Sequence, residues 1–264
     1  MLRKTTFGAL AFSLGLCLLM PAAAETSPEA AKWMQKMIDA YGETAIKADF
    51  TMEMNAAQMG APGGDAKANG TMMMDGKNKR QRMKMDITVN VPQMGEMTMS
   101  MVQVHDGETI WTEMENPMMG GTMVMKMTKA QMEKMSEMQG MSGMTSSTPF
   151  GQEQFEEMKE AFDWTLDGVA GGRVTLSAEI TAEGMASVSG SMPEEQLEKM
   201  DDLGRMVMVL DEKNAMPVEM RLGSFMKMQM SNVQQIDAFP AGTFEYTPPE
   251  GAQVMDVGAM MGGG

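Results

Sequence analysis

Residues 82–91 alternate strictly between polar and apolar side chains. Successive side chains of a β-strand point to opposite sides, so this period of two predicts a strand with one buried and one solvated face. The apolar positions are all odd: Met83, Met85, Ile87, Val89 and Val91. The polar positions are all even: Arg82, Lys84, Asp86, Thr88 and Asn90. The pattern therefore predicts which side of the strand joins a core.

The same period recurs in many other segments of the chain. It is found at Met52 and Met54, at Met72 and Met74, at Met97, Met99 and Met101, at Met123, Met125 and Met127, at Val218, Met220 and Leu222, and at Met226, Met228 and Met230. Alternation on so many segments favours an antiparallel sheet covered on one face only. The chain has 41 methionines but only nine Phe, three Trp and two Tyr. Because thioether side chains are flexible, we expect a soft, adaptable interior.

The N-terminus has the features of a secretory signal peptide. Arg3 and Lys4 precede an apolar run over residues 7–20, and three alanines at 22–24 offer a cleavage site. The run is shorter than the roughly 20 residues of a membrane-spanning helix. We therefore predict a signal peptide over residues 1–24 and a periplasmic mature protein.

The rest of the chain is predicted to form one domain over residues 25–257, followed by a disordered glycine-rich tail at 258–264. The only cysteine, Cys17, lies within the predicted signal peptide. The mature chain would then have no disulfide, so its stability must come from burial. The net charge of −15 argues against nucleic acid and anionic lipid surfaces as partners. No cofactor is expected.

Helices are predicted in two places. The sequence Thr-Ser-Pro-Glu at 26–29 combines a capping hydroxyl, an early proline and an acid, and predicts a helix ending near Tyr41. Its apolar stripe is Trp33, Met34, Met37, Ile38 and Tyr41. Between Thr128 and Phe162 the period changes, which predicts central helices, including one over 152–161. We expect all of these helices to lie over the apolar face of the sheet.

Three stretches together resemble the periplasmic outer-membrane lipoprotein carrier family and the receptor and sigma-regulator domains with the same half-barrel. They are VHDGETIW at 104–111, VLD to MPVEM at 209–220, and FEYTPPEG at 244–251 with Val254 and Asp256. The resemblance implies an α+β, mainly β fold: an incomplete antiparallel barrel with an N-terminal helix and central helices as a lid. It also implies an arginine that keeps the lid closed, for which Arg80 and Arg82 are the two candidates.

The function expected from the resemblance is a non-catalytic carrier. It would hold lipid, or the acyl chains of a lipoprotein, in a methionine-lined cavity. It would pass this cargo from an inner-membrane donor complex towards an outer-membrane acceptor, and act as a monomer. The expected cavity residues are Trp33, Met37, Met83, Met85, Ile87, Val89, Met99, Met101, Trp111, Met123, Met125, Met226, Met228 and Met230.

Alternatives remain open at the level of sequence. The methionines could fill a closed core with no room for cargo, and Trp111 could simply pack against a helix. Thioethers also select Cu(I) and Ag(I), which makes Met132, Met135, Met138, Met141 and Met144 a candidate metal site. An envelope-stress sensor could use the same fold.

Enzyme activity is not expected. The single histidine, His105, precedes an Asp-Gly turn and is interpreted as a solvated loop residue, and no cysteine nucleophile remains after cleavage.

Overall fold

The computed structural model describes residues 26–55, 65–91, 95–116, 121–131, 152–181, 184 and 205–257. These residues form a 12-stranded sheet and two main helices, α1 (Pro28–Glu43) and α3 (Gln152–Ala161). The strands are β1 (Ala45–Asn55), β2 (Asp65–Asp75), β3 (Arg80–Val91), β4 (Gly95–His105), β5 (Thr109–Asn116), β6 (Gly121–Thr128), β7 (Phe162–Ala170), β8 (Arg173–Ile180), β9 (Met206–Asp211), β10 (Pro217–Leu222), β11 (Met226–Ile236) and β12 (Gln253–Asp256). The prediction of a mainly β fold is confirmed.

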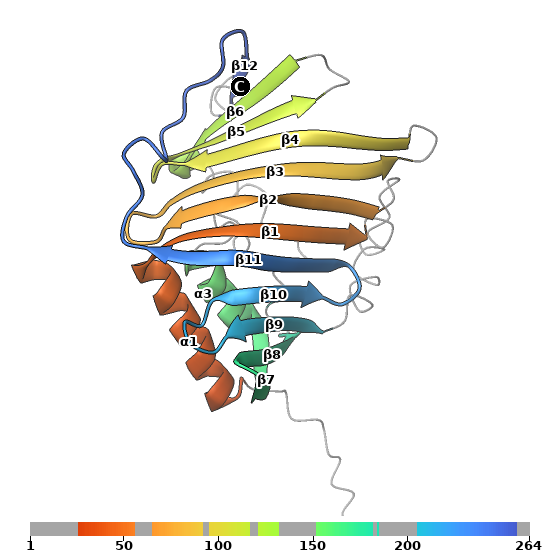
Figure 1. Cartoon of the computed structure of the whole chain (residues 1–264), viewed down its shortest axis with the longest axis vertical. Coiled ribbons are helices and arrows are strands. Elements are labelled where there is room, and N and C mark those ends of the chain that lie inside the picture. The colour runs from red at the N-terminus through yellow and green to blue at the C-terminus, as the bar shows by residue number, and fades with distance from the viewer. Residues whose placement is uncertain are drawn as a thin grey trace, which may run out of the picture.

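The sheet is built from two meanders joined side by side. Its strand order is β12-β6-β5-β4-β3-β2-β1-β11-β10-β9-β8-β7, with β12 and β7 at opposite edges (Figure 1). Strands β1 to β6 follow one another as hairpin neighbours, and β7 to β11 do the same. The meanders meet where β1 pairs antiparallel with β11. The sheet is therefore open, in agreement with the predicted half-barrel.

The alternating stretch at 82–91 forms most of β3, near the middle of the first meander. Met83 lies opposite Met72 of β2, and Met85 lies opposite Met101 of β4. Because opposite residues share a face, the odd positions of β3 lie on the methionine-rich side, which we call the inner face. The even positions, beginning with Arg82, lie on the outer face.

Helix α1 lies on the inner face, as predicted. The Ser27 side chain accepts a hydrogen bond from the backbone N–H of Ala30 at 3.3 Å, which satisfies one free N–H of the first turn. The stripe at Met34, Met37, Ile38 and Tyr41 is buried in the core. Figure 1 shows α1 and α3 beside the part of the sheet that contains β7 to β11.

The structure differs from the predicted fold at the C-terminus. Residues 253–256 form β12, which pairs with β6 in parallel, whereas only antiparallel strands were expected. After β6, where central helices were predicted to begin, the Thr128 hydroxyl accepts a hydrogen bond from the backbone N–H of Gln131 at 3.3 Å. The predicted signal peptide and the predicted glycine-rich tail lie outside the described residues. Within the described part of the chain, no helix is long and apolar enough to cross a membrane.

Candidate functional site

The inner face divides into two regions that differ in burial. The first, the covered half, consists of the inner side chains of β1, β2 and β7–β11 with Met83 and Met85 of β3, which pack with α1 and α3 into one core. Met72, Met208 and Met228 are each at most 1% exposed there. The rings of Tyr41 and Phe155 meet at 4.7 Å and join the two helices. Methionines of the covered half therefore fill a closed core.

The second region, the open half, lies on β4, β5 and β6. Six of its inner methionines are half-buried and belong neither to the core nor to the residues packed against it. These side chains are Met97, Met99, Met114, Met123, Met125 and Met127. Strand pairing places methionines of neighbouring strands side by side: Met101 lies opposite Met114, and Met114 lies opposite Met123. They form a continuous apolar surface that is partly accessible.

The residues predicted to line a cavity fall on both halves. Five are core residues with exposed fractions of 8% or less: Met37, Met83, Met85, Met228 and Met230. Four are half-buried and pack against the core: Trp33, Ile87, Met101 and Met226. Four others are half-buried on the inner face without belonging to the core: Val89, Met99, Met123 and Met125. A ligand-binding role for any of them remains a prediction.

Trp111, one of the predicted cavity residues, lies on the opposite face from the others, and a role in binding cargo stays a prediction. Trp111 lies opposite Val104 of β4, which in turn lies opposite Arg82, so all three are on the outer face. The Trp111 ring packs against that of Tyr246, with centroids 5.4 Å apart. Trp111 therefore contacts the segment that leads to β12.

Arg80 and Arg82, the candidates for closing a lid, both have side chains on the outer face of the sheet, whereas α1 and α3 pack on the inner face. Most of the predicted lid segment lies outside the described residues, so the lid-closing role stays a prediction. Arg80 pairs with Asp75 at 2.5 Å and lies over the Phe244 ring, 4.9 Å from its centroid. Arg82 donates to the backbone carbonyls of Thr243 and Glu245 at 3.2 and 3.4 Å. Both arginines thus hold the C-terminal segment, residues 237–252, against the sheet.

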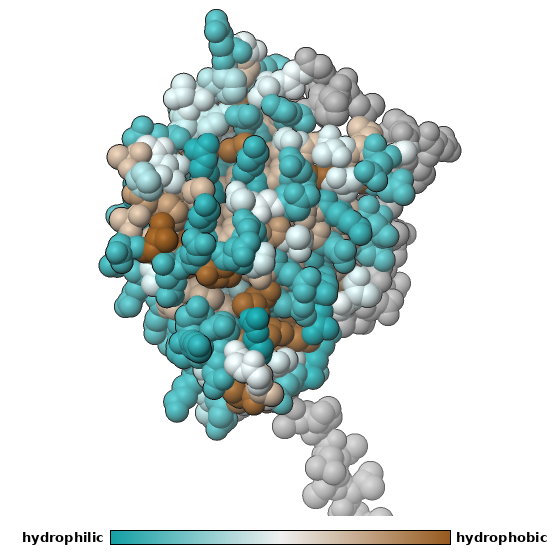
Figure 2. Space-filling view, in the orientation of Figure 1, coloured by the Kyte–Doolittle hydropathy of each residue, from teal (hydrophilic) through white to brown (hydrophobic). Residues whose placement is uncertain are grey.

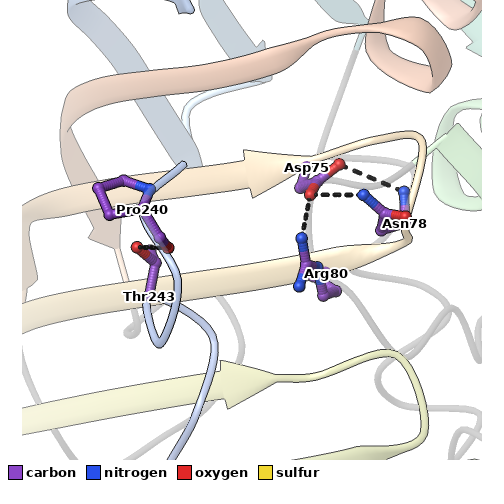
Figure 3. A network of polar contacts seen from close by, with 5 residues as sticks. All are labelled: Asp75, Asn78, Arg80, Pro240 and Thr243. Atoms are coloured by element: carbon purple, nitrogen blue, oxygen red, sulfur yellow. Dashed lines mark hydrogen bonds and ion pairs between the residues drawn. The ribbon is translucent and has the colours of Figure 1, made fainter. Parts of the chain in front are cut away.

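Figure 3 shows the polar contacts at the turn between β2 and β3 and, as a separate group, a contact within the C-terminal segment. Asp75 accepts hydrogen bonds from Arg80 and from the side chain of Asn78, the latter at 2.8 Å. Burial alone would raise the pKa of Asp75, but these bonds outweigh it and hold the pKa below its ordinary value. Beside them, the Thr243 hydroxyl donates to the Pro240 carbonyl at 2.8 Å and closes a turn of the C-terminal segment.

The C-terminal segment covers the outer face behind the open half. The Tyr246 hydroxyl donates to the Glu113 carboxylate at 2.6 Å. Burial and then the Glu113 carboxylate raise the pKa of Tyr246 above its ordinary value. Val104 and Val124, on the same face, are fully buried. Figure 2 shows that most of the face visible in this orientation is nevertheless hydrophilic, with smaller hydrophobic patches.

Sequence reasoning missed a polar group at one end of the inner face. His105 was predicted to be solvated, but it is the last residue of β4 and only 5% exposed. It lies opposite Gln81 of β3, which is 3% exposed. Next to this pair, Gln103 lies opposite Thr112. In β3 and β4 the odd-numbered residues lie on the inner face. Extending this alternation to the ends of both strands would have placed Gln81, Gln103 and His105 on the inner face.

Charged side chains are confined to the outer face in the first meander. By register, every Asp, Glu, Lys and Arg of β1 to β6 points away from the methionines. The inner face there carries only apolar and neutral polar residues, apart from His105. In the part of the chain that the structure describes, no three His, Cys, Asp or Glu residues are grouped to hold a metal ion. The methionine run at 132–144 lies outside that part, and its metal binding remains a prediction.

Comparison with known proteins gives only remote matches. No protein-family model matches the sequence, and no curated protein matches it. The solved structure of MucB has a TM-score of 0.43 and 11% identity, covering 84% of this chain and 64% of the MucB chain. LprF from Mycobacterium bovis has a TM-score of 0.38 and 14% identity over 82% of this chain and 98% of its own. The structure of the lipoprotein LppX from Mycobacterium tuberculosis has a TM-score of 0.41 and 8% identity, covering 81% of this chain and 99% of the LppX chain.

This chain thus spans just under two thirds of the MucB chain. Likenesses this remote are confined to general architecture, and they assign no ligand, partner or activity to this chain.

Proposed function

We propose that this protein is a carrier that holds an acyl chain of a lipid or lipoprotein against the open half of the inner face. The observation behind the proposal is the row of half-buried methionines on β4, β5 and β6, outside the closed core. An apolar surface of this kind, continuous across three paired strands, is typical of a binding site. The absence of charged side chains from the inner face of β1 to β6 is consistent with an apolar ligand.

The energetics are adequate for a carrier. Each methylene group removed from water contributes about 0.8 kcal/mol, so a chain that is only partly enclosed would be held. Methionine side chains change rotamer at little cost and can fit chains of different length. We infer a non-catalytic role in the periplasm, with transfer from an inner-membrane donor to an outer-membrane acceptor. A sensor whose partner contact depends on occupancy would use the same site.

Native mass spectrometry of the purified protein, with solvent extraction, tests the proposal. We expect a co-purifying acyl lipid or acylated peptide. A neutral apolar fluorophore, N-phenyl-1-naphthylamine, should also bind and be displaced by lauroyl glycerol. A bare mass together with no fluorophore binding would contradict the carrier function.

Two neighbouring substitutions on β4 locate the site. Met99 lies on the inner face opposite Ile87, whereas Thr98 is exposed on the outer face opposite Thr88. Met99→Glu places a carboxylate on the apolar surface and should weaken fluorophore binding about tenfold or more, because an ion desolvated by the ligand is costly. Thr98→Glu, the matched control, should bind like the wild type. Equal affinities for the two variants would place the ligand elsewhere.

A further inference from the structure

Gln81 is a buried polar side chain whose hydrogen bonds are not satisfied. It is 3% exposed, and among the described residues neither its amide nitrogen nor its amide oxygen has a hydrogen-bond partner. A buried amide without partners destabilises a folded protein, and most such groups in native structures are satisfied. An unsatisfied amide on the inner face therefore indicates a partner beyond the described residues, and a bound ligand is the partner that we consider.

The neighbours of Gln81 form a polar row that leads to the open half. His105 lies directly opposite Gln81 on β4, and Met83, the next inner residue of β3, lies opposite Gln103. Gln103 in turn lies opposite Thr112 of β5. Gln103 is the diagonal neighbour of Gln81, at a spacing of about 7–8 Å that long side chains can bridge, and Thr112 is about 5 Å from Gln103 as its directly opposite residue. Gln103 and Thr112 are half-buried, and Thr112 lies opposite Met125 of the open half.

The chemistry of this row selects a neutral ligand group. Amide and hydroxyl side chains both donate and accept hydrogen bonds. The inner face of β1 to β6 carries no Lys or Arg, so apart from the imidazole of His105 it has no basic group to neutralise a carboxylate or phosphate. Burying an anion without a counter-charge costs far more than burying an ester or amide. A free fatty acid therefore fits the row less well than an acyl ester or acyl amide.

We propose that Gln81, Gln103 and Thr112 form a subsite for the ester or amide linkage of an acyl chain whose hydrocarbon part lies on the open half. The inference rests on the proposed carrier function and adds the class of ligand. The Gln81 amide donates to the carbonyl of the linkage, and its oxygen accepts from an N–H or O–H next to it. The same linkage occurs in acylglycerols and in N-acylated peptides, and the experiment separates these two sources.

The test uses Gln81→Met, which keeps the length of the side chain and removes its amide. Displacement of N-phenyl-1-naphthylamine is measured with four competitors of equal chain length: lauroyl glycerol, N-lauroyl glycinamide, laurate and dodecane. The wild type should bind the ester or the amide more tightly than laurate and dodecane. Tighter binding of lauroyl glycerol would indicate an acylglycerol as the ligand, and tighter binding of N-lauroyl glycinamide would indicate an N-acylated peptide. Gln81→Met should reduce this preference about fivefold to tenfold while binding dodecane normally.

A second measurement separates a binding role from a structural one. Without ligand, Gln81→Met should have a higher Tm than the wild type, because it removes an unsatisfied buried amide. The same substitution at the exposed Gln234 of β11 should change neither affinity nor Tm. An unchanged preference for the ester and amide in Gln81→Met, or a lowered Tm, would overturn the subsite while leaving the carrier function standing. If the wild type binds neither fluorophore nor competitor, both proposals fail.

Discussion

The two halves of the sheet are stabilised on opposite faces. In the covered half, α1 and α3 pack on the inner face, where Met34 and Met208 are completely buried. In the open half, the C-terminal segment packs on the outer face, through Phe244 and Tyr246. This difference leaves the inner methionines of β4 to β6 half-buried. One methionine-rich face thus serves as a core in one region and as an accessible surface in the other.

The largest expected effect comes from truncating a methionine in the covered half. Met208→Ala removes a side chain that is 0% exposed and leaves a cavity, so it should lower the free energy of unfolding by about 2–5 kcal/mol. Met114→Ala, the matched change in the open half, should cost less than about 1 kcal/mol. Chemical denaturation of both variants measures the difference. Equal losses would show that the open half is as tightly packed as the core.

The sequence predicted the sheet well because its signal is local. The alternation of Met83, Met85 and their polar neighbours fixes both the strand and its face. Likewise, the capping sequence before Pro28 fixes where α1 begins. Neither feature depends on distant parts of the chain.

The candidate site was predicted less well. Trp111 was assigned to the cavity by residue type, although the position of Ile110 and Met114 on the inner face implies that Trp111 lies outside. β12 has only four residues, and its parallel pairing with β6 depends on a segment folded across the outer face. The division of the methionines into two halves depends in the same way on where α1 and the C-terminal segment pack, which no local pattern indicates.

An intermediate effect is expected at the outer face of the open half. Trp111→Leu removes the ring contact with Tyr246 and should lower the free energy of unfolding by about 1–2 kcal/mol. Hydrogen exchange should quicken in β12 and β6 more than in α1, because the C-terminal segment loses its anchor. Affinity for N-phenyl-1-naphthylamine should stay unchanged. A loss of affinity comparable to that of Met99→Glu would return Trp111 to the binding surface and contradict the assignment of faces.

The smallest effect concerns Asp75, where the C-terminal segment meets the turn between β2 and β3. The pKa of this carboxyl is lowered in the folded protein because the hydrogen bonds from Arg80 and Asn78 outweigh the effect of burial. The ionised form therefore stabilises the fold above the ordinary value of 3.8, and this contribution is lost as the pH falls through the lowered pKa. The Asp75→Asn variant has no carboxylate at this position, so it lacks this contribution to stability at every pH.

The free energy of unfolding of the wild type should thus exceed that of Asp75→Asn at neutral pH, and the gap should close on acidification. Asn78→Ala removes one hydrogen-bond donor to the Asp75 carboxylate. The difference in free energy of unfolding between this variant and Asp75→Asn should therefore depend less on pH than the difference between the wild type and Asp75→Asn. Denaturation curves across the acid range measure all three proteins. A gap that stays constant with pH would mean that the charge of Asp75 does not hold the C-terminal segment. The outer face of the open half would then depend on the packing of Phe244 and Tyr246 alone.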